Sequence, residues 1–358
     1  MFGIVINKNM NIAIDCRFIG KSGIGTYIEN IVDWFLDKHP EHEYVLICEQ
    51  GKGLPTKTNV EIFETDIQPF SLRELLYFPV AEINKCDAYF SPYINIPGEI
   101  KVPVYSTIHD CVFFDVDGLV SPVGKMVRRF FYKRALYLSK KIFTVSEFSK
   151  ERILTHFPTD KEIIVTGNGI SKGIENYQVG EIVKKDYFIY VGNIKKHKGL
   201  QTLVRAYAKA RGQGLNTKLL LVGNNEKFRS SDTELTELIE TTPDFVFTGW
   251  VNNEELIRLI SEAKALIQPS LYEGFGIPPL EALYLGTHAI ISDIPVFKEI
   301  YKELPVTFFK CGDAEDLAEK MMMVERNELP ENTKEQINKI YSYNRVANTI
   351  IKTIERTL

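Results

Sequence analysis

Residues 271–283 read "LYEGFGIPPLEAL" and follow the short apolar run "KALIQPS". Pro278 and Pro279 suit the first turn of a helix that starts near Pro278, because the N–H groups that proline lacks would have no partner within the helix there. Gly274 and Gly276 permit a tight turn just before that helix. The stretch therefore predicts a strand, a glycine turn and a helix in direct succession.

Short β-branched or aromatic runs alternate with longer amphipathic runs along the whole chain. This alternation predicts an α/β fold, with parallel sheets covered by helices on both faces. The pattern restarts after the middle of the chain, which indicates two doubly wound domains. The expected strands are residues 11–16, 44–50, 87–92, 102–110, 140–146 and 162–170, and then 187–193, 217–225, 245–250, 264–270 and 288–293.

The domain boundaries follow from where the pattern weakens. We expect a first domain over residues 1–170, a polar linker over 171–186, a second domain over 187–340 and a closing helix over 341–358. Residues 1–9 precede the first strand and look like an appendage. Because ligands bind at the carboxyl ends of parallel strands, two facing domains would form a cleft between them.

The composition narrows the class of protein. The net charge of −4 gives no general attraction to nucleic acid, and the five cysteines contain no CxxC pair that would indicate zinc or a disulfide framework. No apolar run reaches the ~18 residues of a membrane span. We expect a cytoplasmic globular protein.

The glycine turn and helix of the opening stretch also predict a ligand site. A helix N-terminus preceded by glycines binds anions, so the N–H groups of Gly276, Ile277 and Leu280 would meet a diphosphate or sugar hydroxyls. A carboxylate repels phosphate, so Glu281, expected in the first turn, would accept hydrogen bonds from ribose hydroxyls. Glu273 would reach other hydroxyls. The alternative is a plain turn with one solvated and one capping glutamate.

The stretch "PSLYEGFGIPPLEAL", followed by "GTHAIISDIPVFKEI", closely resembles the signature of family 4 retaining glycosyltransferases, whose hallmark is this E-x7-E pair. "AIDCRFIGKSGIGTYIENIV", "STIHD", "FTVSEFSK", "VTGNGI", "YVGNIKKHKGLQTLVRAYAK" and "FTGWVNNEEL" follow the family's order and spacing. The resemblance covers nearly the whole chain. It implies the GT-B fold of two facing Rossmann-like domains with a cleft between them, and a last helix that crosses back onto the first domain.

In the second domain the resemblance implies a site for the sugar donor. Glu273 would lie at the sugar and Glu281 at the ribose, while Lys198 would neutralise the leaving phosphate. The backbone of Gly274, Phe275, Gly276 and Ile277 would hold sugar hydroxyls, and the helix start at Leu280 would face the diphosphate. Without the resemblance, Lys198 would be a solvated lysine in a run of three.

Other implied donor contacts lie outside the opening stretch. His109 would touch the donor sugar, and Gly23 and Gly25 would open a helix toward the diphosphate. Trp250 and Val251 would lie at the nucleobase. From the residues alone, His109 would cap a turn and Trp250 would be a buried aromatic.

The loop "GNIKKHKG" departs from the family pattern. Asn193 stands at the strand end, and His197 stands where a basic residue is common. Either Lys195 or Lys196 is then the candidate for a second phosphate-binding cation.

Two look-alike motifs are rejected. "DCRFIGKS" at residues 15–22 lacks the first glycine of a P-loop. "DVD" at residues 115–117 resembles the metal-binding acids of the GT-A fold, but no other metal-ligand spacing accompanies it. The GT-B resemblance implies catalysis without metal or other cofactor.

Residues 125–141 begin at Lys125, end at Lys141 and read "KMVRRFFYKRALYLSKK", with seven Lys or Arg and no acid. The aromatics Phe130, Phe131, Tyr132 and Tyr137 interleave with the basic residues. One interpretation is a helix that packs its aromatic face on its own domain. The other is a basic helix on anionic lipid, at the inner face of the plasma membrane. Single-stranded nucleic acid would also suit this composition, but no other feature of the sequence supports nucleic-acid binding.

The resulting hypothesis is a metal-independent retaining hexosyltransferase. It would move a hexose from a GDP-, UDP- or dTDP-linked donor to a glycan or lipid-linked acceptor during synthesis of a surface polysaccharide, such as O-antigen or capsule. Residues 68–85, with "SPYINIPGE" after them, resemble mannosyl- and rhamnosyltransferases. The alternatives are a GT-B sugar-nucleotide epimerase, which would lack the E-x7-E pair, and a non-catalytic nucleotide-sugar-binding protein.

Overall fold

The computed structural model describes residues 9–177, 182–193, 195–223, 237–239, 241–325 and 328–358. The chain forms two compact units, Met1–Asn168 with Tyr343–Leu358, and Gly169–Ser342. The boundaries expected from the sequence are residues 170 and 341. Residues 171–186, expected to be a linker, fall within the second unit, and residues 178–181 of that segment lie outside the described residues.

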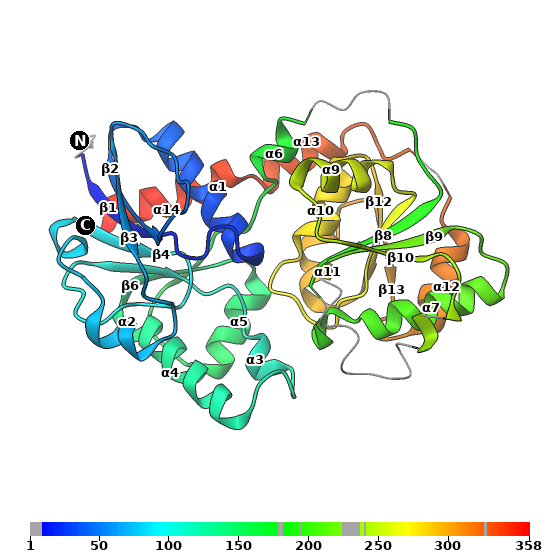
Figure 1. Ribbon diagram of the computed structural model, residues 1–358, viewed down its shortest axis with the longest axis horizontal. Helices are drawn as coiled ribbons and strands as arrows, with labels where there is room; N and C mark the ends of the chain where they lie inside the picture. The colour runs from blue at the N-terminus through cyan, green and yellow to red at the C-terminus, as the bar shows by residue number, and fades with distance from the viewer. Residues whose placement is uncertain (1–8, 178–181, 194, 224–236, 240, 326–327) are drawn as a thin grey trace. The chain divides into compact units, whose positions relative to one another are not determined.

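The first unit is built on a seven-stranded sheet with the order β3-β2-β1-β4-β5-β6-β7 (Figure 1). Every neighbouring pair is parallel. The strand β3 was missed in the sequence, because half of its residues are only partly buried at the sheet edge. The strands are β1 (Asn11–Asp15), β2 (Glu43–Glu49), β3 (Val60–Thr65), β4 (Ala88–Ser91), β5 (Val104–Thr107), β6 (Ser139–Thr144) and β7 (Ile163–Val165).

Helices complete the first unit, and the final helix of the chain is among them. The last helix packs on the first one, and the His39 ring lies 3.1 Å from Asn348 Oδ1. The helix that begins at Leu72 ends at Tyr77, because Pro79 disfavours helical backbone at the residue before it. The helices are α1 (Ser22–Lys38), α2 (Leu72–Tyr77), α3 (Val112–Asp115), α4 (Pro122–Leu138), α5 (Glu147–His156) and α14 (Tyr343–Thr357).

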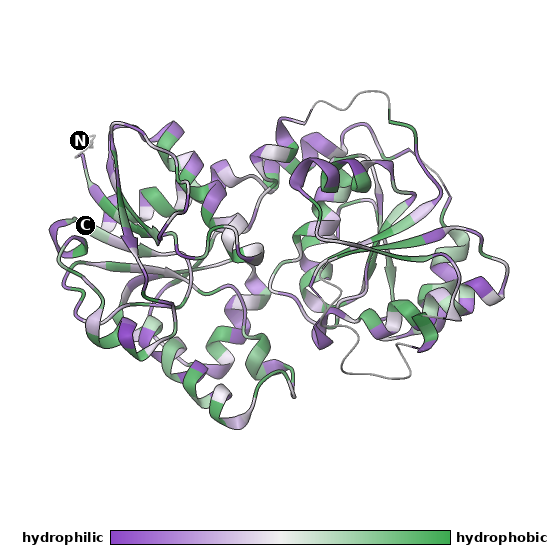
Figure 2. Cartoon of the chain, in the orientation of Figure 1, coloured by the Kyte–Doolittle hydropathy of each residue, from purple (hydrophilic) through white to green (hydrophobic). Residues whose placement is uncertain are grey.

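The second unit repeats the design with a six-stranded parallel sheet, in the order β10-β9-β8-β11-β12-β13. Its strands are β8 (Tyr187–Val191), β9 (Lys218–Val222), β10 (Phe245–Gly249), β11 (Ala265–Gln268), β12 (His288–Ser292) and β13 (Val306–Phe309). Its described helices are α6 (Lys172–Glu175), α7 (Leu200–Gly212), α9 (Asn253–Glu262), α10 (Ile277–Tyr284), α11 (Pro295–Tyr301), α12 (Ala314–Met323) and α13 (Thr333–Ile340). The central strands are strongly apolar (Figure 2), as expected for strands with helices on both faces.

Each sheet has a topological switch point where the strand order reverses. In the second unit it lies between β8 and β11, and in the first unit between β1 and β4. Ligands of open α/β sheets bind outside the carboxyl ends of the strands at such points. The loops that follow β8 and β11 carry Lys198 and Glu273, so the fold itself places these residues where a ligand site is expected.

A charged network lies buried in the first unit. The Arg17 guanidinium donates to both oxygens of Asp15, at 2.9 and 2.5 Å, and to Glu74 Oε1 at 2.5 Å. Tyr89 also donates to Asp15, and Asn95 donates to Glu74. All three charged side chains are closed to solvent. The network ties the end of β1 to α2.

Among the described residues, no helix is both long enough and apolar enough to cross a membrane.

Candidate donor-binding site

The loops after β8 and β11 are locked together by backbone contacts. The N–H of Leu271 donates to the carbonyl of His197 over 2.8 Å. Gly199, at φ 66°, lies so close to the other loop that an added Cβ would be 1.8 Å from the carbonyl oxygen of Pro269. No residue but glycine fits there, and the close approach brings Lys198 beside Glu273.

Lys198 and Glu273 form an ion pair in which the ammonium contacts both carboxylate oxygens. Lys198 Nζ lies 2.7 Å from Oε1 and 2.8 Å from Oε2 of Glu273, which is almost fully buried. Ser270 Oγ donates to Oε1 over 2.7 Å, and Gln268 Nε2 lies 3.4 Å from it. The expected positions put the two charges on different parts of a donor, and their pairing was not predicted. Ser270 and Gln268 were also missed, although both stand in "IQPS" at the end of the strand.

The helix α10 begins at Ile277 with Pro278 in its first turn, one residue before the expected start. Gly276 precedes it at φ 89°, and an added Cβ would lie 2.3 Å from the Phe297 ring. Among the described residues no side chain caps this helix, and the two prolines have no N–H to offer. The N–H groups of Gly276 and Ile277 are those that the helix start offers to an anion, whereas the N–H of Leu280, expected to do the same, lies against the Tyr301 hydroxyl.

Glu281 is the fifth residue of α10 and lies just beyond its first turn, one residue further along the helix than expected, because the helix starts at Ile277. Its side chain keeps partial exposure, but closely packed protein atoms desolvate the carboxyl group. This burial disfavours the charged form and raises the pKa of Glu281 to about 7. Glu281 is therefore poised between its neutral and ionised forms near neutral pH.

The loop after β8 presents three exposed polar residues and one buried ring. Asn193, Lys195 and Lys196 are exposed, whereas His197 is buried. Burial, helped by the neighbouring Lys198, lowers the pKa of His197 to about 4. His197 is therefore neutral at pH 7 and supplies no second cation.

The residues expected at the nucleobase follow β10. Trp250 is 85% exposed and Val251 is partly buried. The interpretation of Trp250 as a buried aromatic is wrong, because the indole lies beyond the end of the strand. An exposed indole leaves a flat apolar surface open to a ligand.

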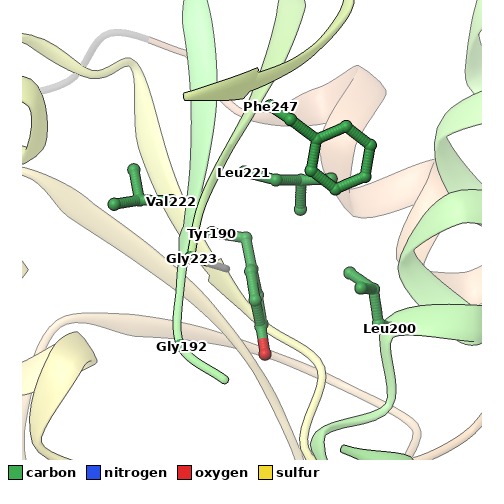
Figure 3. Close-up of a pocket in the computed structure, with 7 residues that line it drawn as sticks. All are labelled: Tyr190, Gly192, Leu200, Leu221, Val222, Gly223 and Phe247. Carbon is green, nitrogen blue, oxygen red and sulfur yellow. The ribbon is translucent and has the colours of Figure 1, made fainter. Parts of the chain in front are cut away.

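A small pocket opens beside these loops at the ends of β8, β9 and β10 (Figure 3). Its lining is apolar apart from the Tyr190 hydroxyl, which donates to the carbonyl of Asn193 over 3.2 Å. The space has no room for a water molecule and no charged group in its wall. It is a packing gap behind the β8 loop, and the candidate site lies instead around Lys198 and Glu273.

The remaining site candidates belong to the first unit. His109 follows β5, its Nε2 lies 2.8 Å from the carbonyl oxygen of Pro92, and its ring meets Tyr27 edge-on at 4.7 Å. Because a carbonyl only accepts, Nε2 carries the proton and Nδ1 keeps a lone pair. Burial lowers the pKa of His109 to about 4, against the opposing effect of the Pro92 bond. His109 is therefore a neutral acceptor at pH 7.

Gly23 and Gly25 lie inside the first turn of α1, not in a loop before it. A Cβ at Gly25 would be 2.4 Å from the carbonyl oxygen of Phe18, whereas a Cβ at Gly23 would point into open space. Gly25 is therefore needed for the turn itself, and Gly23 leaves the helix start uncovered.

The acids of the "DVD" segment have other partners. Asp115 accepts from Arg152 at 2.5 Å and lies 2.7 Å from His156 Nε2. Within the described part of the chain, one group could hold a metal ion: His39, Glu41 and His42. These residues precede β2, so they lie at the amino edge of the sheet, away from the strand ends that carry His109.

Comparisons with known proteins bear on the family and the fold of the chain. The family "Glycosyl transferases group 1" matches residues 174–342. An O-antigen chain mannosyltransferase of Salmonella typhimurium, RfbU, is 33% identical over 54% of this chain and 53% of its own. O-antigen chain mannosyltransferase B of Escherichia coli is 27% identical over 59% and 58%. The matches thus span little more than half the length of these relatives.

Solved structures extend the likeness to the whole chain. Anabaena HepE in complex with UDP and glucose superposes with a TM-score of 0.73 at 16% identity, covering 97% of this chain and all of that one. At this identity the likeness concerns the fold alone. Two parallel α/β units and these neighbours confirm the GT-B fold that the motifs predicted, and within that fold residues 174–342 match the glycosyl transferases group 1 family.

Proposed function

We propose that the protein is a retaining glycosyltransferase that moves a hexose from a nucleotide-diphosphate sugar to a glycan or lipid-linked acceptor in surface polysaccharide synthesis. The observation that carries the proposal is the pairing of Lys198 with Glu273 at the switch point of the second sheet, beside the uncapped start of α10. A cation, free N–H groups and a hydroxyl-binding acid are the parts that a sugar diphosphate requires.

Each part of the donor then has a partner. The N–H groups at the start of α10 and the Lys198 ammonium receive the diphosphate, while Glu273 accepts from sugar hydroxyls and Glu281 from the ribose. The exposed Trp250 offers its face to the base. Asn193 and the backbone of residues 274–277 border the sugar.

The chemistry breaks the bond between sugar C1 and the β-phosphate oxygen and forms a bond from C1 to the acceptor oxygen. Lys198 and the dipole of α10 stabilise the charge that develops on the departing diphosphate, so the proposal includes no metal or other cofactor. The proton of the acceptor hydroxyl leaves to a base, and the candidate is His109, whose Nδ1 carries a lone pair at pH 7. Retention of configuration is the family's stereochemistry.

The donor is a GDP-, UDP- or dTDP-hexose. The names of the similar O-antigen mannosyltransferases favour a mannosyl donor, and HepE was solved with UDP and glucose. The E-x7-E pair and its Lys198 partner disfavour the epimerase and the non-catalytic alternatives. We also propose, from the basic residues 125–141, that a cytoplasmic protein of this kind is drawn to the inner face of the plasma membrane.

A thermal-shift panel of GDP-, UDP- and dTDP-hexoses tests the donor assignment. A ligand at 100 times its Kd adds ~2.7 kcal/mol of stability, so one donor class should raise the melting temperature clearly. The matching free sugar, which lacks the nucleotide, is the control. A panel in which no nucleotide sugar shifts the transition would contradict the proposal.

The affinity for the donor should rise with pH around neutrality. Glu281 accepts ribose hydrogen bonds best when ionised, and its pKa of about 7 leaves it mostly protonated at pH 6 and mostly ionised at pH 8. Binding should therefore tighten roughly tenfold across this range. Calorimetric titration with an intact nucleotide sugar measures the change without interference from a terminal phosphate.

Glu281→Gln provides the matched control for this pH dependence. The variant should bind weakly and without the slope, because His109 and His197 titrate near pH 4 and stay neutral throughout. The same linkage lowers the stability of the unliganded protein as pH rises from about 4.5 to about 7, since the folded carboxyl holds its proton longer than the unfolded one. Equal slopes in wild type and variant would remove Glu281 from the ribose site.

A further inference from the structure

The helix α4 exposes apolar side chains where a surface helix normally exposes polar ones. Val123, Met126, Val127, Phe130 and Tyr137 are exposed, with Phe130 at 51% and Tyr137 at 81%. Their spacing puts them on one face, opposite the buried Tyr132, Ala135 and Leu136. One interpretation of the sequence was that these aromatics pack on their own domain. It is confirmed for Phe131 and Tyr132, and it is wrong for Phe130 and Tyr137.

The short helix α2 also exposes apolar side chains, and it buries a charged one. Its inward side chain is the carboxylate Glu74, held in the buried network by Arg17. Its outward side chains are Leu72 and Leu76, which are one turn apart, and Tyr77. The network therefore fixes α2 with two leucines in solvent, an arrangement that hydrophobic burial alone would reverse.

The two helices form one continuous surface. Phe70, just before α2, meets the Phe131 ring edge-on at 5.2 Å, and Phe131 meets Phe130 at 5.4 Å. Residues 96–98 connect the two helices. Arg134 of α4 donates to the carbonyls of Ile96 and Pro97, and the N–H of Gly98 donates to the carbonyl of Glu74 in α2. Figure 1 shows α2 and α4 side by side on the first unit, and Figure 2 shows apolar segments along α4. We call Phe70, Leu72, Leu76, Tyr77, Val123, Met126, Val127, Phe130 and Tyr137 the apolar surface.

The charge around the apolar surface has one sign on α4. Residues 125–141 contain seven Lys or Arg and no acid. Several cations have internal partners, such as Arg128 over the Phe113 ring at 4.2 Å and Arg129 over Phe114 at 5.1 Å. They are only partly exposed, whereas Lys133 is open to solvent. The exposed face is therefore apolar at its centre and positive along its flank.

We propose that the apolar surface inserts into a bilayer that contains anionic lipid, with α2 and α4 both entering the interface. An apolar face bordered by cations matches acyl chains below negative headgroups. A second copy of this chain fits less well, because a face-to-face pair would bring its own cations together. This inference rests on the proposed function only in one respect: insertion would give the glycosyltransferase access to a lipid-linked acceptor.

Insertion differs from the purely electrostatic attraction inferred from the basic residues. Electrostatic binding disappears at high salt, because the Debye length falls to about 3 Å at 1 M. Burial of apolar side chains persists there, and α2 contributes without a cluster of cations. The bound fraction that survives high salt is therefore the distinguishing observation.

Sedimentation of the full chain with vesicles tests the proposal. Vesicles of phosphatidylcholine mixed equally with phosphatidylglycerol should bind the protein, and part of the binding should remain in 1 M salt. The double variant Leu76→Glu with Phe130→Glu should lower binding at least about tenfold, since it places two charges in the acyl region. Lys133→Ala should weaken binding at low salt and leave the salt-resistant part unchanged.

Met323→Glu is the matched control, because Met323 is an exposed apolar residue on α12 of the second unit. It should bind vesicles like wild type. The proposal is overturned by double-variant binding equal to wild type, by complete loss of wild-type binding in salt, or by a dimer in lipid-free ultracentrifugation that Phe130→Glu dissociates. The thermal shift caused by a nucleotide sugar is measured on the same double variant. A normal shift shows that donor binding is intact, so a loss of membrane binding is distinguished from a failure of the proposed function.

Discussion

Replacing Lys198 with alanine should lower donor-dependent transfer by about 10²–10³-fold, the usual effect of removing one preorganised group from a developing anion. Lys198 carries the only positive charge that the structure places against Glu273 among the described residues. The charge on the diphosphate increases as the C1–O bond breaks, so the ammonium acts mainly in the transition state. The loss should therefore appear in kcat more than in donor affinity.

Lys185→Ala is the matched control for this experiment. Lys185 pairs with Glu262 over 2.7 Å at the surface of the same unit, with half of its side chain exposed. Its removal should leave transfer unchanged. A purely structural role for Lys198 predicts instead that stability falls while kcat of the remaining folded protein stays near wild type, and that outcome would contradict the assignment.

Replacing Arg17 with methionine should destabilise the first unit by about 3–5 kcal/mol, the effect expected when one partner of a buried ion pair is removed. Asp15 and Glu74 would remain in a solvent-free interior without the guanidinium that joins them. Burial already raises the pKa of Glu74, with Arg17 opposing the shift. The variant should regain part of its stability at acid pH, where the Glu74 carboxyl takes up a proton.

Arg73→Met provides the comparison on α2, the helix that carries Glu74, because the Arg73–Asp66 pair is mostly exposed at both ends. Its effect should be within about 1 kcal/mol. The chain has two tryptophans, Trp34 in α1 and Trp250 in the second unit. Urea unfolding in a Trp250→Phe background therefore reports the first unit through Trp34. Equal effects of the two arginine variants would show that the buried network does not stabilise the unit.

Local patterns in the sequence were sufficient for the elements that surround the donor site. The Pro-Pro pair and the two glycines predicted α10 and the turn before it, with an error of one residue at the start. That error moved Glu281 out of the first turn. The strand β3 was missed because an edge strand is only partly buried and does not show the apolar run of a central strand.

Contacts between distant parts of the chain could not be read from the sequence. Lys198 and Glu273 are 75 positions apart, and their pairing depends on Gly199 meeting Pro269. The outward leucines of α2 follow from where Arg17 holds Glu74, which no periodicity reveals. A helix that buries its acid and exposes its leucines breaks the rule by which amphipathic patterns are interpreted.

Release of nucleoside diphosphate from a nucleotide sugar by the full chain tests the central claim most directly. With the donor that the thermal-shift panel selects and an acceptor glycan, wild type should release the diphosphate and form a glycoside with the anomeric configuration of the donor. Lys198→Ala should release it about 10²–10³-fold more slowly. Donor binding without any turnover in the presence of acceptors, or equal turnover in wild type and Lys198→Ala, would contradict the account.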